Sequence, residues 1–217
     1  MAKKGKSKTS RKSVRKAVSR KTAKKKTAKV AKKKPAVKKA APKAAGKFNM
    51  LVTFDPSHRG IADLELKTVL KQIGEVPKIT ATEIDGLCKV AVKDARAAVK
   101  KITALVSSNP AIFVATRHYI PVDSWVKSEI SQMKEAVKKA CAGIGPKEKW
   151  KMSLNKRHWD KMESTPLIIR LTEVVESRNV DLDKPDKIIQ TEIIANEAGI
   201  SLLKPSEIAD IQRIKAK

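Results

Sequence analysis

Hydrophobic and polar positions follow two periods along residues 48–116, one typical of strands and the other of helices. Apolar and β-branched runs at 48–54, 87–92 and 111–116 indicate buried strands, and the alternating residues 78–84 indicate a fourth. Apolar residues at helical spacing predict helices over 61–73 and 94–106, the second capped by Asp94. Asp85 and Gly86 favour a tight hairpin. The resulting order of strand, helix, strand, strand, helix, strand is the split βαβ motif.

The same analysis predicts a second set of elements beyond residue 120. Helices are expected over 124–140 and 164–177, strands over 150–154, 187–195 and 200–203, and a short helix from 204. These elements form a second α/β unit with at least three strands and three helices. The predicted fold class is therefore α/β (α+β), with a ferredoxin-like βαββαβ domain over residues 48–120 and a second domain over 121–217.

Residues 1–47 differ sharply in composition from the rest of the chain. They hold 21 Lys and Arg and no Asp or Glu, whereas the other residues hold 28 basic and 22 acidic side chains. Most of the net charge of +27 therefore lies in this segment. It has no aromatic residue, Leu or Ile, so it cannot bury enough apolar surface to fold, and we expect a disordered tail. Such a polycation binds polyanions, most often nucleic acid.

The sequence offers no visible set of catalytic or metal-ligating residues. His58, His118 and His158 lie far apart and lack Cys or carboxylate partners at metal-ligand spacing. Cys88 and Cys141 are too few for a disulfide framework and fit a reducing compartment. No apolar run approaches the roughly 18 residues that span a membrane. We expect a protein without cofactor or membrane association, located in the cytoplasm, with a nuclear or nucleoid location left open by the basic tail.

Candidate nucleic-acid contacts follow the predicted strand at 150–154. Residues 155–159, Asn-Lys-Arg-His-Trp, combine two cations, an amide, an imidazole and an indole, which contact phosphates and stack on bases when they share an exposed turn. The alternative is a solvated turn with Trp159 packed into the body. Arg117, at the end of another strand, is a similar candidate. A lysine row on the helix predicted at 124–140 is either a binding surface or a solvated face, and comprises Lys127, Lys134, Lys138 and Lys139.

The segment 187–208, KIIQTEIIANEAGISLLKPSEI, resembles the signature of the THUMP domain. It has an apolar strand with an acidic residue, the strand Gly-Ile-Ser-Leu-Leu, and then a basic residue, Pro and an acidic helix start. Residues 155–158 also resemble the segment after the first strand of that domain. The resemblance implies a ferredoxin-like domain followed by a THUMP domain that binds the acceptor region and 3′ end of tRNA. The candidate RNA contacts are Lys156, Arg157, His158 and Lys204, followed by Arg117 and Lys151.

Among THUMP proteins, the chain resembles the stand-alone members that serve as the tRNA-binding adaptor of an RNA cytidine acetyltransferase. The resemblance implies no catalysis by this chain, which would present tRNA to that partner. Lys204 departs from the family pattern, where Arg is common, and this weakens a bidentate phosphate contact. The alternative hypothesis is an architectural chromatin or general nucleic-acid-binding protein that acts through its lysine-rich tail.

Overall fold

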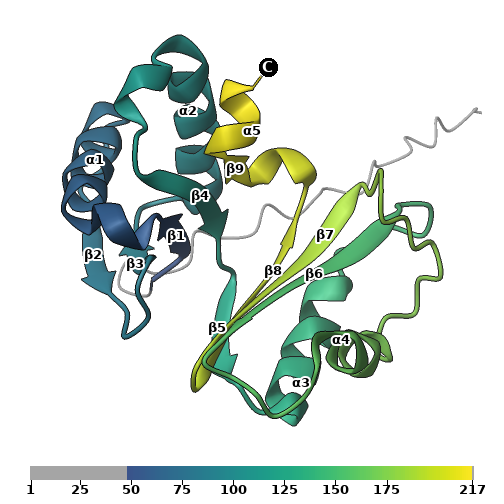
Figure 1. The fold of residues 1–217 in the computed structure, drawn as a ribbon. Helices are drawn as coiled ribbons and strands as arrows, with labels where there is room; N and C mark the ends of the chain where they lie inside the picture. The colour runs from purple at the N-terminus through teal and green to yellow at the C-terminus, as the bar shows by residue number, and fades with distance from the viewer. Residues whose placement is uncertain (1–47, 217) are drawn as a thin grey trace, which may run out of the picture. The chain divides into compact units, whose positions relative to one another are not determined.

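The structure, a computed structural model, describes residues 48–216 and contains two β-sheets (Figure 1). The predicted disordered tail, residues 1–47, lies outside the described residues. The described residues include five α-helices, and the fold belongs to the mixed α/β class that the sequence predicts.

The first sheet is antiparallel, with the strand order β2-β3-β1-β4-β9. Its first elements along the chain are β1 (Met50–Phe54), α1 (Arg59–Gln72), β2 (Lys78–Ala81), β3 (Leu87–Ala91), α2 (Ala95–Ser108) and β4 (Thr116–Pro121). This is the predicted βαββαβ order of a ferredoxin-like unit. Gly86 turns the hairpin between β2 and β3 with a φ of 78°, and an added Cβ there would lie 2.8 Å from a backbone oxygen of β1.

The core of this unit lies between the sheet and its two helices. Met50 and Val52 from β1 pack in one buried cluster with Leu66 of α1 and Ile102 of α2. Asp94 caps α2 as predicted, because its carboxylate accepts hydrogen bonds from two N–H groups of the first turn at 2.9 and 3.0 Å. Apolar positions at strand and helix spacing therefore meet on one side of the sheet.

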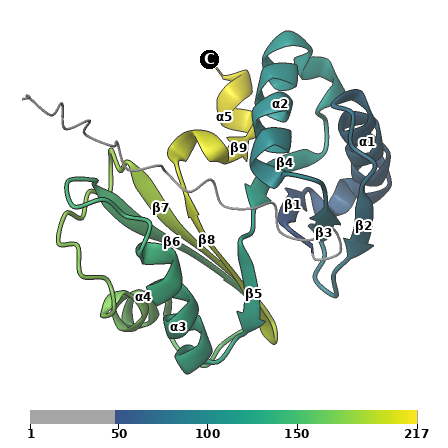
Figure 2. The ribbon, with the colours of Figure 1, turned by 180° about the vertical axis from the view of Figure 1, so that it is seen from behind.

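The second sheet has the strand order β5-β8-β7-β6. Its strands are β5 (Ser124–Lys127), β6 (Trp150–Arg157), β7 (Lys187–Ile194) and β8 (Glu197–Leu203), and only the pair β6 and β7 is parallel. Two helices, α3 (Ile130–Cys141) and α4 (Ser164–Thr172), lie side by side on one face (Figures 1 and 2). Part of the opposite face meets the first sheet in a small apolar cluster that includes Leu51, Leu87, Ile194 and Leu203.

The strand predicted at 111–116 is wrong. Pro110–Ile112 forms a 3-10 helix, and the strand of this region, β4, begins only at Thr116. The reason is the buried carboxylate of Glu65 in α1, which accepts the N–H groups of Val114 at 2.8 Å and Ala115 at 2.7 Å. A side chain from another element therefore takes the backbone donors that a strand would use.

The helix predicted at 124–140 begins six residues too early. Ser124–Lys127 is β5, which pairs with β8, and the helix starts at Ile130. The indole of Trp125 does not lie on a helix; its Nε1–H donates to the carbonyl oxygen of Phe48 at 2.8 Å. The strand predicted at 150–154 is too short, since β6 continues to Arg157, and α4 ends at Thr172 rather than near residue 177.

The last residues return to the first sheet. After a 3-10 helix at Pro205–Glu207, β9 (Ala209–Asp210) pairs with β4, and α5 (Ile211–Lys215) lies beside α2 in both views (Figures 1 and 2). The sequence places this segment in the second domain and predicts a helix from residue 204. The α-helix of this segment, α5, begins only at Ile211 and packs beside α2 of the first unit, so α3 and α4 are the described α-helices that pack on the second sheet. The described chain thus passes from the first sheet to the second and back again.

Candidate nucleic-acid interface

The carboxyl ends of β6 and β7 share one edge of the second sheet, because these strands are parallel. Each is followed by a residue in the left-handed backbone region, His158 with a φ of 53° and Ala195 with a φ of 48°. The N–H of Ala195 donates to the carbonyl oxygen of Arg157 at 2.9 Å. No other non-glycine residue in 48–216 has a positive φ. Such residues cost about 1–3 kcal/mol each and cluster at functional sites. This edge is therefore the candidate site.

A buried carboxylate organises the polar side chains on the helix-free face at this edge. Glu192 in β7 is 1% exposed. It accepts hydrogen bonds from Arg157 Nη1 at 2.8 Å, Asn155 Nδ2 at 2.7 Å and Gln190 Nε2 at 2.6 Å. The side chain of Arg157 keeps 30% exposure. Its guanidinium therefore binds the buried carboxylate and is also accessible from the solvent, so a phosphate can approach the guanidinium.

Glu192 was missed as a site residue from the sequence. Its signal is the alternation of Gln190 and Glu192 within the otherwise apolar strand 187–194. Polar residues two apart lie on the same face of a strand, and Asn155 and Arg157 have the same spacing on β6. The register of β6 against β7, which pairs Asn155 with Glu192, comes only from the structure.

Three loops converge at the candidate site. The carbonyl oxygen of Ser128 accepts the indole N–H of Trp159 at 3.0 Å, and the Ser128 hydroxyl donates to the carbonyl oxygen of Ala195 at 2.7 Å. The N–H of Ser128 donates to the carbonyl oxygen of Asn196 at 2.9 Å. The connection before α3, the one after β6 and the β7–β8 turn are thus tied together, which supports the two left-handed residues.

The exposed turn predicted at 155–159 is only partly correct. Asn155 and Arg157 belong to β6, and Trp159 is 3% exposed, so its ring is closed to a nucleobase. Lys156 turns its ammonium inward, where it donates to the carbonyl oxygen of Met162 at 2.9 Å. His158 is exposed and follows Arg157 directly. Arg157 and His158 are therefore the side chains best placed for a ligand, while Lys156 steadies the following loop.

Lys151 and Lys204 lie at the opposite end of the second sheet. Lys151 is paired with Ile188, which is paired in turn with Leu203, the residue before Lys204. Arg157 lies six positions after Lys151 along β6, a span of about 20 Å at the usual rise of a strand. Lys151 donates to the carbonyl oxygen of Leu182 at 3.1 Å. Lys204 is exposed beside an open hollow that is also lined by Lys147, Glu148 and Asp186.

Arg117 lies apart from these residues, in β4 of the first sheet. Its Nη2 group is 3.1 Å from the carboxylate of Asp55, at the end of β1. The hydroxyl and N–H of Ser57, followed by the hydrogen bond from Arg117, lower the pKa of Asp55 to about 2. Arg117 thus already has an anionic partner. The six predicted contacts are distributed over three places on the protein.

The lysine row predicted on one helix is divided between two elements. Lys127 belongs to β5, and the others belong to α3. Lys134 donates to Glu173 at 2.6 Å and lowers the pKa of that carboxyl group, and Lys139 lies 3.9 Å from Glu135. Acidic neighbours thus offset part of the row, which favours the solvated-face alternative for α3.

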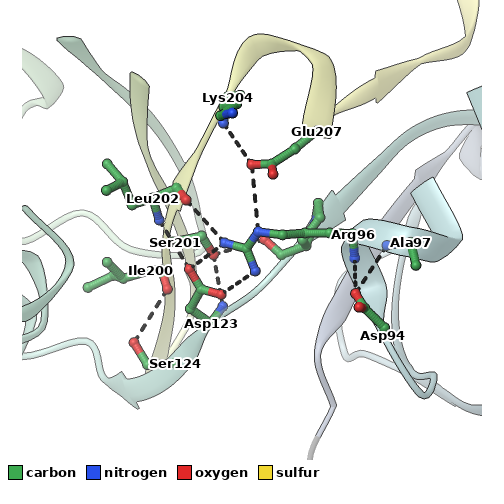
Figure 3. A network of polar contacts seen from close by, with 11 residues as sticks. Asp94, Arg96, Ala97, Asp123, Ser124, Ile200, Ser201, Leu202, Lys204 and Glu207 are labelled. Carbon is green, nitrogen blue, oxygen red and sulfur yellow. Dashed lines mark hydrogen bonds and ion pairs between the residues drawn. The ribbon is translucent and has the colours of Figure 1, made fainter. Parts of the chain in front are cut away.

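A polar network fixes the connection between the two sheets (Figure 3). Arg96 in α2 binds both carboxylate oxygens of Asp123, and its Nη2 also donates to the carbonyl oxygen of Leu202 at 3.1 Å. The same guanidinium lies 3.6 Å from Glu207, whose carboxylate accepts the N–H of Lys204 at 2.8 Å. Hydrogen bonding to Asp123 raises the pKa of Arg96. The network links the two sheets at the Lys204 end.

Within residues 48–216, no group of three or more His, Cys, Asp and Glu is placed to hold a metal ion. None of the helices there is long and apolar enough to cross a membrane. The two cysteines are free thiols, and burial raises the pKa of Cys88 to about 12.

Comparison with known proteins relates the fold, and only the fold, to solved structures. No family model and no curated protein matches the sequence. PH1313 from Pyrococcus horikoshii Ot3 superimposes with a TM-score of 0.52 and 16% identity over 71% of this chain and 54% of that chain. TrmN from Thermus thermophilus gives 0.48 and 14% over 72% and 46%, and a 4-thiouridine synthetase in complex with RNA and ATP gives 0.46 and 10% over 76% and 42%. The chain spans about half the length of these proteins.

Proposed function

We propose that this protein binds tRNA, with the carboxyl ends of β6 and β7 as a principal contact surface. The observation that carries the proposal is the cluster at this edge, where Arg157 and the left-handed His158 lie beside the left-handed Ala195 and the buried carboxylate of Glu192. An arginine held in this way offers a pre-ordered donor for phosphate, and an exposed imidazole stacks on a base or contacts the backbone.

The sequence resemblance to THUMP domains supports the same surface. The segment that carries it, residues 187–208, forms β7, the turn at the candidate site and β8, and ends with the 3-10 helix at the opposite end of the sheet. Glu192 and Ala195 both lie within that segment. The proposed ligand, following the resemblance, is the acceptor stem and 3′ end of tRNA. A site on a sheet edge with exposed donors suits a single-stranded end whose bases are unstacked.

The proposal extends to a non-catalytic role. The candidate site consists of donors and one buried carboxylate in a structural hydrogen-bond cluster, so a partner would supply the chemistry. Following the resemblance, that partner is an RNA cytidine acetyltransferase, with a cytoplasmic location in keeping with the free thiols. In a reconstituted reaction, acetylation of tRNA by such an enzyme should depend on the wild-type chain and fall with Arg157→Ala.

Binding of the full chain to three ligands tests the function. Intact tRNA, tRNA trimmed of its 3′ end and duplex DNA should be compared over a salt series, for wild type and for the double variant Arg157→Ala, His158→Ala. We expect the wild type to prefer intact tRNA and the variant to lose that preference, with a shallower salt dependence. Equal binding of all three ligands by both proteins would contradict the proposal.

A second candidate is non-specific nucleic-acid or chromatin binding through residues 1–47. The observation that favours it is the 21 basic residues there without one Asp or Glu. Each phosphate neutralised releases condensed counterions, whatever the sequence of the nucleic acid. Removal of residues 1–47 separates the candidates. A tRNA-binding body keeps its preference for intact tRNA, whereas an architectural protein loses nearly all binding.

A further inference from the structure

We infer that Glu192 is a positioning residue whose buried carboxylate holds Arg157 and Asn155 in place for contact with RNA. The inference rests on the proposed function. Glu192 itself is 1% exposed, so a ligand at the sheet surface does not reach it. Its effect on binding must therefore act through the side chains that donate to it.

The chemistry of a carboxylate dictates how its partners are oriented. An ionised carboxylate only accepts hydrogen bonds, so every partner must turn an N–H toward it. Arg157, Asn155 and Gln190 do so at 2.6–2.8 Å. The amide nitrogen of Asn155 is thereby committed to Glu192, and its side-chain oxygen is left as an acceptor. Because Asn155 is exposed, β6 presents this acceptor two residues before the guanidinium of Arg157.

The position of β6 makes the arrangement useful to a ligand. β6 is the outermost strand on its side of the sheet. Along its length it pairs with β7 alone, apart from a bridge between Trp150 and Val180 at its start. Arg157, at its other end, is followed by the left-handed His158. A flexible arginine loses rotamer freedom on binding a phosphate. Arg157 has already lost much of this freedom by binding Glu192, so its contact with a phosphate costs less conformational entropy.

A positioning role of Glu192 and a purely electrostatic role predict opposite changes in RNA binding when its carboxylate is removed. RNA is a polyanion, so removal of a negative charge beside its binding surface strengthens binding if charge alone matters. If Glu192 positions Arg157 and Asn155, the same change weakens binding. The isosteric variant Glu192→Gln removes the charge with the least change in volume. Its amide also brings donors opposite those of Arg157, so the cluster cannot form as before.

The test measures tRNA affinity of the full chain over a salt series. We expect Glu192→Gln to weaken binding about two- to tenfold, the cost of ordering one long side chain. The matched control is Asp160→Asn, which removes an exposed charge from the loop after β6 and should leave affinity unchanged or slightly raised. In the double variant with Arg157→Ala, Glu192→Gln should add less than it does alone, because the contact through Arg157 is already lost and only the positioning of Asn155 remains.

Two outcomes decide the matter. Binding of Glu192→Gln as tight as wild type or tighter, while Arg157→Ala weakens binding, would overturn the positioning role and leave the proposed function intact. No effect of Arg157→Ala would instead count against the proposed site. If Glu192→Gln is too unstable for the assay, Arg157→Lys keeps the charge without the planar fork. It should also bind two- to tenfold more weakly, at an unchanged salt slope, and wild-type affinity would refute the role.

Discussion

Arg96 and Asp123 form a bidentate ion pair across the junction of the two sheets, with Nη1–Oδ1 and Nη2–Oδ2 distances of 2.7 and 2.9 Å (Figure 3). Asp123 also accepts the N–H of Leu202 at 3.2 Å, and its own N–H donates to the Ser201 hydroxyl at 2.9 Å. One carboxylate thus ties α2, the β4–β5 connection and β8 together. Because of this geometry, the pair holds α2 and β8 in a fixed relative position, unlike an ordinary surface ion pair.

Asp123→Ala should therefore destabilise the protein more than loss of an ordinary surface pair. Both partners are about a third exposed, so solvent screening reduces the effect, and we expect a loss of about 1–2 kcal/mol in the free energy of unfolding. The matched control is Arg59→Ala, which breaks the exposed pair with Asp85 at 3.3 Å and should cost less than about 0.5 kcal/mol. Urea unfolding of both variants measures the difference, and equal losses would contradict the assigned role.

Replacement of Glu65 should destabilise the protein more than Asp123→Ala, because the Glu65 carboxylate is buried and accepts hydrogen bonds from several backbone N–H groups. Glu65→Gln keeps the shape but turns an NH₂ group toward donors at residues 114–116. We expect a loss of about 2–4 kcal/mol in the free energy of unfolding. Amide hydrogen exchange at Val114 and Ala115 should also become faster. Asp63→Asn, an exposed change on the same helix, is the control. Slow exchange retained in Glu65→Gln would show that other contacts hold this loop.

Local patterns predicted the order of the first unit, since its strands and helices have distinct periods and Asp94 and Gly86 mark their ends. The errors have a common cause in long-range contacts. The apolar run at 111–116 looks like a strand, but Glu65, about fifty residues earlier, binds its N–H groups. Similarly, Trp125 fits a helical face in the sequence, yet pairing of β5 with β8 places it in a strand.

The candidate site was also only partly predictable, because long-range strand pairing determines which of its residues lie together. Residues 155–158 were singled out by their chemistry, and Arg157 and His158 do lie at a distinctive place. The sequence could not show that Lys204 lies at the far end of the sheet, because the order β8-β7-β6 and the strand directions determine that separation. Nor could it show that β7 supplies the carboxylate that Arg157 binds.

Asp55 gives the protein a pH-dependent element. Ser57 and then Arg117 lower its pKa from 3.8 to about 2. A carboxyl group with a lowered pKa in the folded state contributes stability that is complete above its unfolded pKa, near 4, and is lost as the pH falls through about 2. Asp55→Asn should therefore be less stable than wild type at pH 7, and the difference should shrink between pH 4 and pH 2. Urea unfolding at several pH values measures this, and a constant difference would contradict it.

Separation of the predicted contacts leads to a test of how far RNA extends over the second sheet. Arg157 and Lys204 lie at opposite ends of it and at the ends of strands that are two apart, so strand geometry separates them by more than about 20 Å. Their variants Arg157→Ala and Lys204→Ala share no hydrogen-bond partner, so their effects on tRNA binding should add within about 0.5 kcal/mol. Each should also reduce the salt slope by about one. A dinucleotide cannot cover both ends, and its binding should respond to one variant alone. Strong non-additivity with tRNA would mean that the two residues act at one contact, contrary to their positions in the fold.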